Sequence, residues 1–212
     1  MPLIFEKIHE DSGSKIAVWE KTESDEELLA CLELDSNQKA RLEEVRASRK
    51  REWLCSRMLI DQLFPDKDYK LFKDSFGKPF IVNSNYFISL SHTDNKAAAI
   101  VSKKIVGIDI QNDVKKIDRI YPKFISQLEL GAIDEEHRHE SYQIFWSAKE
   151  AMYKAYGKKK LEFRKHMHLY AFKYYQDNLQ LCGWVHKNET KQDYCIFTEK
   201  IQDCYLVYAI LR

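Results

Sequence analysis

The clearest periodic pattern in the chain lies between residues 145 and 157. Its apolar residues recur at spacings of three and four, and they are Phe145, Ala148, Met152 and Ala155. This spacing predicts an amphipathic α-helix with Gly157 as its C-cap. Ser147, Glu150 and Lys154 share another side of the same helix, so a carboxylate and an ammonium group lie one turn apart.

A Glu–Lys pair at this spacing is usually a solvated ion pair that stabilises a helix by a few tenths of a kcal/mol. Two neighbours favour a functional role here. Trp146 precedes the pair, and Asp109 is a second carboxylate inside the apolar run 105–110. A lone carboxylate in a buried strand is costly unless it is paired or binds a cation, so Asp109 is a candidate metal ligand. Gly107 in the same run lets another backbone approach closely.

Shorter patterns predict the other elements of the first half. Alternating residues predict strands at 3–5, 15–19, 69–72, 86–92 and 97–101. A capping box at Ser24 and a polar start near Asp35 predict two helices, and a third runs from about residue 48 to 64. Residues 74–79 form a predicted turn that presents Lys78 at its tip.

The second half contains a strand, shorter helical patterns, the long helix and a run of β-like segments. A helical pattern lies within 112–125, and a capping box at Ser126 predicts another helix after it. The β-like segments are residues 168–175, 179–186, 193–198 and 204–211. These elements predict an α+β fold with an N-terminal half at 1–104 and a C-terminal half at 105–212.

Cations and a histidine of the first half have two interpretations each. Arg49, Lys50 and Arg51 stand at the start of the third predicted helix. They form either a solvated helix end or an anion site, because helix N-termini attract phosphate. His92 follows Ser91 at a strand end and is either a structural histidine or a phosphate donor. The sequence alone does not separate these interpretations.

The composition restricts the class of protein. Lys and Arg total 34 and Asp and Glu total 33, a formal charge of +1, which argues against a general nucleic-acid-binding protein. Five cysteines without a CxxC pair predict reduced, mostly buried thiols. The chain shows neither a signal-peptide pattern nor the ~20 apolar residues that span a membrane. We therefore expect a soluble, cytoplasmic protein.

Four short motifs occur in one order along the chain. They are Gly77-Lys78-Pro79, Ser91-His92, Gly107-Ile108-Asp109 and Trp146-x-x-Lys149-Glu150-x-x-x-Lys154. This series resembles the 4′-phosphopantetheinyl transferases of the large, Sfp-like type, over about residues 36–157 by motif and the whole chain by length. The resemblance implies a monomer built as a pseudo-dimer of two similar α+β halves. Each half has a small antiparallel sheet packed on helices, and coenzyme A lies in the cleft between the halves.

The resemblance also implies an activity. The family moves the phosphopantetheine arm of coenzyme A onto a serine of an acyl or peptidyl carrier protein and releases 3′,5′-ADP. The implied cofactor is Mg²⁺, which prefers one or two carboxylates plus substrate oxygens. By resemblance, Asp109 and Glu150 hold the metal, and Glu150 also accepts the serine proton. Lys154 meets the phosphate and the charge that develops on the leaving group.

Further residues are assigned to coenzyme A by the resemblance. Ser91 and His92 contact its phosphates, and Lys78 lies along the nucleotide. Arg51 holds the 3′-phosphate, and Lys39 is a second candidate for the same role.

One position departs from the family. Its fuller pattern is Gly-Ile-Asp-x-Glu, with the last Glu as a third metal ligand, whereas this chain has Gln111. Gln111 lies two residues from Asp109 and therefore on the same strand face. We expect it to hold a metal-bound water or to ligate weakly.

The carrier is expected to dock around residues 112–125 and 126–137. The exposed cations expected to steer an acidic carrier are Lys115, Lys116, Arg119 and Lys123. The alternative is that these cations form an ordinary solvated helix face.

Three other functions stay open. A different magnesium-dependent enzyme acting on nucleotide diphosphates would use the same carboxylates, but it would not need Lys78, Ser91 or Arg51. A non-catalytic module that binds coenzyme A or a carrier would explain Gln111 as decay. A nucleic-acid binder built on residues 49–51 and 158–160 conflicts with the balanced charge. The transferase is the preferred interpretation, with coenzyme A and a carrier as partners and without nucleic acid or membrane.

Overall fold

The computed structural model describes residues 2–64, 69–158, 160–175 and 178–212. The helices in these ranges are α1 (Asp25–Ala30), α2 (Ser36–Glu44), α3 (Lys50–Leu63), α4 (Ile117–Ile120), α5 (Gln127–Leu130), α6 (Arg138–Tyr156) and α7 (Phe163–His166). Short 3₁₀ turns occupy Ala47–Arg49 and Tyr121–Lys123. The strands are β1 (Leu3–His9), β2 (Ser14–Glu20), β3 (Leu71–Lys73), β4 (Pro79–Ile81), β5 (Phe87–His92), β6 (Lys96–Ser102), β7 (Val106–Asn112), β8 (Met167–Leu169), β9 (Gln180–Lys187), β10 (Thr190–Ile201) and β11 (Cys204–Leu211).

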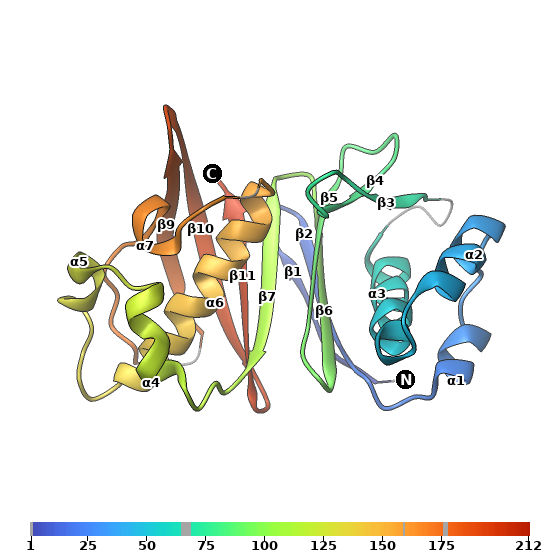
Figure 1. Cartoon of the computed structure of the whole chain (residues 1–212), viewed down its shortest axis with the longest axis horizontal. Coiled ribbons are helices and arrows are strands. Elements are labelled where there is room, and N and C mark those ends of the chain that lie inside the picture. Colours follow the sequence, from blue (N-terminus) through green and yellow to red (C-terminus); the bar gives the residue numbers. More distant parts are fainter. Residues whose placement is uncertain (1, 65–68, 159, 176–177) are drawn as a thin grey trace.

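The described strands form two antiparallel sheets that stand next to each other in the middle of the molecule (Figure 1). The first sheet has the order β1-β2-β6-β5-β4-β3, and the second has the order β7-β11-β10-β9-β8. Apart from β1, the chain follows the same order for each sheet. It first forms one strand, then helices, and then a meander of four strands. The last strand of each meander pairs with the first strand of its sheet, so the two sheets share one strand order.

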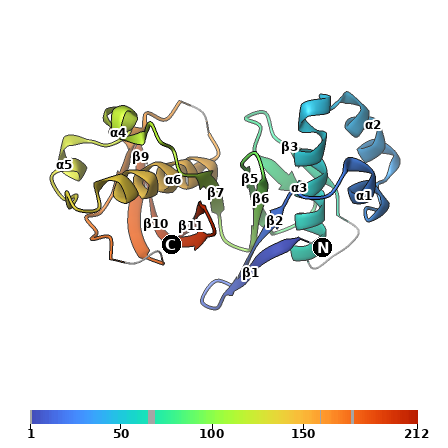
Figure 2. The ribbon, with the colours of Figure 1, turned by 90° about the horizontal axis from the view of Figure 1, so that it is seen from below.

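The helices cover the outer faces of the two sheets, as Figures 1 and 2 show from two directions. Helix α3 packs on the first sheet through Leu54, Leu59 and Ile60. Helix α6 packs across the second sheet, where it buries its apolar face. The α+β class expected from the sequence is confirmed.

A third apolar layer joins the two sheets to each other. The first sheet contributes Ile16, Val18, Ala98 and Ile100, and the second contributes Val106, Ile108, Ile110, Leu206, Tyr208 and Ile210. Strands β6 and β11 are therefore apolar on both faces, which explains their continuous hydrophobic sequence. This layer stabilises the junction at which residues of both sheets meet.

Helix α6 has the buried face that the sequence predicts. Phe145, Ala148, Met152 and Ala155 are at most 1% exposed. Gly157 ends the helix in the left-handed conformation, with φ 72°, and its N–H donates to the Tyr153 carbonyl at 3.0 Å.

The turn 74–79 folds against the end of α6. The Lys78 Nζ donates to the Ala155 carbonyl at 2.6 Å, which places a cation at the negative end of the helix dipole. The expectation that this turn presents Lys78 at its tip was therefore wrong. The unpaired carbonyls at the end of α6 supply the acceptor that draws the ammonium group inward.

Helix α6 and strand β7 approach each other at Gly107. A Cβ atom added at this glycine would lie 2.0 Å from the Ala151 carbonyl oxygen and 2.5 Å from the Ala155 nitrogen. The sequence-based expectation of a close backbone approach at Gly107 is confirmed. The contact sets how far side chains of α6 extend over β7.

Several element boundaries differ from the sequence predictions. Regular strand structure in the expected segment 168–175 ends at Leu169, although Phe172 and Tyr174 still pack on the core beside α6. Apolar alternation after Leu169 thus reflects packing without a regular strand. The helical pattern in 112–125 yields only α4 and a 3₁₀ turn, where Pro122 removes a backbone donor.

The capping boxes at Ser24 and Ser126 are confirmed. All five cysteines are free, but only Cys55 and Cys204 are buried, so the expectation of mostly buried thiols was wrong. In the described part of the chain, no helix combines the length and apolarity that crossing a membrane requires.

The contact at Gly107 gives a first prediction. Gly107→Ala should lower the free energy of unfolding by about 3 kcal/mol or more, because the added methyl group collides with the backbone of α6. Chemical denaturation with matched slopes measures this change.

Gly131→Ala is the matched control, since its added Cβ would meet only atoms 3.8 Å or further away. Equal stabilities of Gly107→Ala and Gly131→Ala would contradict the close approach.

Candidate functional site

One strand from each sheet and helix α6 meet at one place. Strand β5 of the first sheet contributes Ser91, strand β7 of the second contributes Asp109, and helix α6 contributes Glu150 and Lys154. We call these four residues the junction site. They are far apart in the sequence, and the contact of α6 with β7 together with the packing of the two sheets brings their elements together.

Lys154 is the centre of the hydrogen bonds in the junction site. Its Nζ donates to the Asp109 Oδ1 at 2.8 Å, to the Ser91 Oγ at 2.8 Å and to the Ile108 carbonyl at 2.9 Å. The Ser91 hydroxyl donates to the same Asp109 oxygen at 3.1 Å. The ammonium group therefore neutralises one side of a carboxylate that is only 3% exposed.

The serines of β5 also complete the hydrogen bonding of β7. Strand β7 is an edge strand of the second sheet, so its outward N–H groups need partners. The Ile108 N–H donates to the Ser89 hydroxyl at 3.1 Å, and the Ile110 N–H donates to the Ser91 hydroxyl at 3.2 Å. Ser91 thus fixes β7 against the first sheet while it contacts Asp109 and Lys154.

The Glu150 carboxyl group has a pKa well above that of an ordinary glutamate. Burial raises the pKa of its carboxyl to about 7, and the negative charge of Asp109 adds to the rise against the attraction of Lys154. A carboxyl group with this pKa can accept or release a proton near neutral pH.

The oxygen donors in and beside the junction site are of the kinds that Mg²⁺ prefers. The second carboxylate oxygen of Asp109, Oδ2, is buried and has no hydrogen-bond partner among the described residues. Glu150 is close enough for its pKa to respond to the charge of Asp109, and the half-buried Gln111 follows on the same face of β7. Two carboxylates and an amide oxygen suit Mg²⁺, which keeps further positions for water and substrate oxygens.

The donor set is small. Within the ranges that the structure describes, no group of three or more His, Cys, Asp or Glu side chains could hold a metal ion. A metal at the junction site would therefore depend on Gln111, on water or on the substrate for its remaining ligands.

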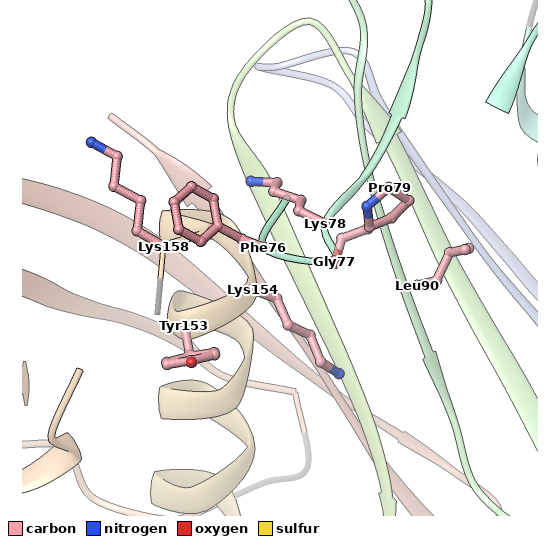
Figure 3. A pocket seen from close by; sticks show the side chains of 10 residues that line it. Phe76, Gly77, Lys78, Pro79, Leu90, Tyr153, Lys154 and Lys158 are labelled. Atoms are coloured by element: carbon pink, nitrogen blue, oxygen red, sulfur yellow. The ribbon is translucent and has the colours of Figure 1, made fainter. Parts of the chain in front are cut away.

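A cavity of about 390 Å³ opens beside the junction site (Figure 3). Its lining residues are Phe76, Gly77, Lys78, Pro79, Ser89, Leu90, Tyr153, Lys154, Gly157 and Lys158. Figure 3 shows Tyr153 and Lys154 on α6 and the turn with Gly77 and Lys78 around this space. Three lysines around an apolar wall suit a ligand that combines a negative charge with an apolar part.

A second cavity of about 330 Å³ shares Pro79 and Leu90 with the first. Arg41, Arg57, Lys70 and Lys73 supply cations, and Trp53 and Phe72 supply aromatic rings. The Arg57 guanidinium lies 3.6 Å from the centre of the Trp53 ring, and its buried Nε has no partner among the described residues. The two cavities together offer cations and aromatic surface to an extended, anionic ligand.

The structure places the residues predicted to bind coenzyme A in different surroundings. Ser91 is part of the junction site, and Lys78 lines the first cavity while it donates to Ala155. Burial lowers the pKa of Lys78. The Nε2 of His92 lies 2.9 Å from a Glu52 oxygen, and burial lowers the pKa of His92 against the attraction of Glu52.

The other predicted cations lie outside both cavity linings. The Arg51 Nε donates to Asp25 at 3.2 Å on a half-exposed surface. Lys39 is exposed on α2, whereas Arg41, two residues further along, lines the second cavity.

Sequence reasoning missed Arg41, Trp53 and Arg57 as candidate binding residues. Trp53 and Arg57 are four residues apart on α3, so they share one helix face. That spacing was the available signal, but only the packing of α2 and α3 near β3 shows that the face lines a cavity.

Lys149 also received no role from the sequence. Its side chain is fully buried, and its Nζ donates to the carbonyls of Phe124 and Met167 at 2.7 and 3.1 Å. It also forms a 2.8 Å ion pair with Glu129, which is fully buried as well. Burial lowers the pKa of Lys149, and Glu129 opposes this change. Lys149 therefore connects α6, the helix that carries Glu150, to the chain segments that precede and follow it in the sequence.

The comparisons with known proteins bear on this geometry. Residues 105–198 match the family model of the 4′-phosphopantetheinyl transferase superfamily. The matched residues run from just before β7 into β10, so they include Asp109, Gln111, Glu150 and Lys154. The comparison with curated proteins found no match. The superfamily match supports phosphopantetheine transfer in general terms, with coenzyme A and a carrier protein as partners.

The surroundings of Glu150 give a second prediction. Because its pKa is raised, the folded protein binds one proton more than the unfolded chain between about pH 4.5 and pH 7, and stability falls as pH rises through this window. Glu150→Gln removes this loss. The variant should therefore exceed the wild type by about 1–3 kcal/mol at pH 8 and by much less at pH 4.5.

Denaturant unfolding at both pH values measures the difference. Glu43→Gln, a change at an exposed position of α2, is the control and should show little dependence on pH. The same stability difference between Glu150→Gln and wild type at both pH values would contradict the raised pKa.

Proposed function

We propose that this protein transfers the 4′-phosphopantetheine arm of coenzyme A to a serine of an apo carrier protein and releases 3′,5′-ADP in a magnesium-dependent reaction. One observation carries the proposal. Asp109 and Lys154 are hydrogen-bonded beside a Glu150 with a pKa of about 7, inside the region that matches the superfamily.

The junction site has a group for each requirement of this reaction. The serine oxygen attacks the phosphorus next to the pantetheine, and the bond from that phosphorus to the bridging oxygen breaks, so that this oxygen leaves with 3′,5′-ADP. Glu150 is the base that accepts the serine proton, which its pKa near 7 allows. Lys154 stabilises negative charge on the transferred phosphoryl group and on the departing 3′,5′-ADP.

Asp109, Glu150 and Gln111 are the residues that would hold Mg²⁺. When bound, Mg²⁺ supplies positive charge to the pyrophosphate oxygens. Lys154 and Ser91 orient Asp109 through its Oδ1, which leaves the buried Oδ2 for the ion. Gln111 adds an oxygen without charge, so the metal site depends on the two carboxylates for its negative charge.

The two cavities, which share Pro79 and Leu90 in their linings, suggest how coenzyme A lies. We place its pyrophosphate by Lys154 in the first cavity and its nucleotide end toward Trp53 and Arg57 in the second. Stacking on an aromatic ring and pairing with guanidinium groups suit an adenine base and a phosphate. Lys78, His92, Arg51 and Lys39 remain candidates for the same phosphates.

The shared strand order of the two sheets supports a pseudo-dimer of an N-terminal half, residues 1–104, and a C-terminal half, residues 105–212. The boundary falls in the short connection between β6 and β7. Because one chain supplies both sides of the junction site, a monomer is sufficient for activity. On this basis we propose the large, Sfp-like type.

The carrier surface is proposed around α4 and α5. Lys115, Lys116, Arg119 and Lys123 are exposed there, and Leu128 is 77% exposed. His139 of α6 holds Asp118 of α4 at 2.6 Å and Asp113 at 2.8 Å, so the basic segment is fixed to the helix that carries Glu150. An acidic carrier would be steered toward the junction site.

Intact mass of a carrier protein tests the proposed function. Purified apo acyl carrier and apo peptidyl carrier are each incubated with the protein, coenzyme A and Mg²⁺. We expect a gain of roughly 340 Da, the mass of a phosphopantetheine arm, on at least one carrier. Glu150→Ala should lower the rate by at least about 100-fold, whereas the exposed-surface control Glu43→Ala should retain it.

The failures of this test point to different functions. Breakdown of coenzyme A without any carrier would indicate a magnesium-dependent hydrolase of nucleotide diphosphates. Binding of coenzyme A with no mass gain on either carrier would indicate a non-catalytic module and would contradict the transferase.

Charge reversal tests the carrier surface. The double variant Lys116→Glu, Lys123→Glu should raise the KM for the carrier by about 10-fold and leave the KM for coenzyme A unchanged, because it alters only the encounter with an acidic partner. Lys191→Glu, on β10, is a control of equal charge per substitution. Equal rises in both KM values would contradict this docking surface.

A further inference from the structure

Two half-buried cysteines of the second sheet lie directly opposite each other. Cys182 of β9 is the register partner of Cys195 of β10. They lie on the two strands of one hairpin and are 13 residues apart in the sequence. Neither residue belongs to the junction site or lines either cavity.

The backbone hydrogen bonds identify the type of pair. The Cys182 carbonyl accepts from the Tyr170 N–H at 3.0 Å, so it points away from β10. Counting from the hairpin turn between Lys187 and Thr190 gives the same result, a pair without mutual backbone hydrogen bonds. The Cα atoms of such a pair lie about 4.5 Å apart, within the range of about 4.4–6.8 Å found in disulfides.

A guanidinium group contacts both sulfur atoms. The Arg212 Nε donates to the Cys195 Sγ at 3.2 Å, and its Nη2 donates to the Cys182 Sγ at 2.6 Å. The two sulfurs therefore project from the same face of the sheet. This shared donor holds the two thiols close to each other.

Two other cysteines provide a contrast within the same chain. Burial raises the pKa of the Cys55 thiol and of the Cys204 thiol to about 11. Both are buried, whereas Cys182 and Cys195 are partly accessible to solvent. Reaction with a small disulfide is therefore favoured at the opposed pair over these two thiols.

We propose that Cys182 and Cys195 form a redox-responsive dithiol that a small disulfide oxidises reversibly. One thiolate attacks the small disulfide, forms a mixed disulfide and releases one small thiolate. The second cysteine then attacks the protein sulfur of that mixed disulfide and releases the other thiolate. The small disulfide is reduced to two thiols, and the two protein thiols are oxidised to one bond between β9 and β10.

This proposal is independent of the transferase function, and the test uses glutathione disulfide. The full chain is incubated with it and analysed by intact mass, and it is then unfolded, alkylated and analysed by peptide mapping. We expect a loss of roughly 2 Da in the oxidised chain and a 182–195 link, with two of the five cysteines protected from alkylation. Added dithiothreitol should restore alkylation at all five.

Variants assign the reaction to this pair. Cys182→Ser and Cys195→Ser should each prevent the internal bond, whereas Cys31→Ser should leave it unchanged. Arg212→Gln should slow formation of the bond several-fold, since it removes the donor to both sulfurs. Circular dichroism melts confirm that each variant is folded before oxidation.

Oxidation should also raise the Tm of the wild type and leave that of Cys182→Ser unchanged, because the bond restricts the unfolded chain. Alkylation of all five cysteines after oxidation, a bond mapped to other cysteines, or a stable glutathione adduct on the wild-type pair would overturn the proposal.

Discussion

The close contact between helix α6 and strand β7 is the constraint on which the rest of the structure depends. Gly107 leaves no room for a side chain between the two backbones, and Ala148, Ala151 and Ala155 keep the facing surface of α6 small. At this separation Lys154 reaches both the Asp109 carboxylate and the Ile108 carbonyl of β7. A larger spacing would separate the carboxylates of Asp109 and Glu150, and with them the proposed metal site.

Ser91 and Lys154 of the junction site also help to hold the two sheets together. Ser89 and Ser91 satisfy N–H groups at the edge of β7, and Lys154 satisfies one of its carbonyls. Two of these groups, Ser89 and Lys154, also line the first cavity. The cost of burying the Asp109 carboxylate is offset by Lys154, and its remaining oxygen is available for chemistry.

Much of this arrangement could be predicted from the sequence because it follows from local rules. Short-range sequence patterns are enough to predict the buried face of α6, the capping boxes and the close approach at Gly107. The unpredicted parts depend on tertiary contacts. Lys78 turns inward to the last carbonyls of α6, and Arg57 lines a cavity only because α2 and α3 pack near β3. The end of β8 at Leu169 was also not predicted, because the apolar residues after it alternate as in a strand but pack on the core without strand pairing.

The central claim is that Asp109 and Glu150 act as one unit in the transfer reaction, and a double-mutant cycle tests it most directly. The transfer rate at saturating coenzyme A, carrier and Mg²⁺ is measured for Asp109→Asn, Glu150→Gln and the double variant. Each single variant should lose at least about 100-fold, and the double variant should be no slower than the slower single variant. Losses that multiply in the double variant would show that the two carboxylates act independently and would contradict the account.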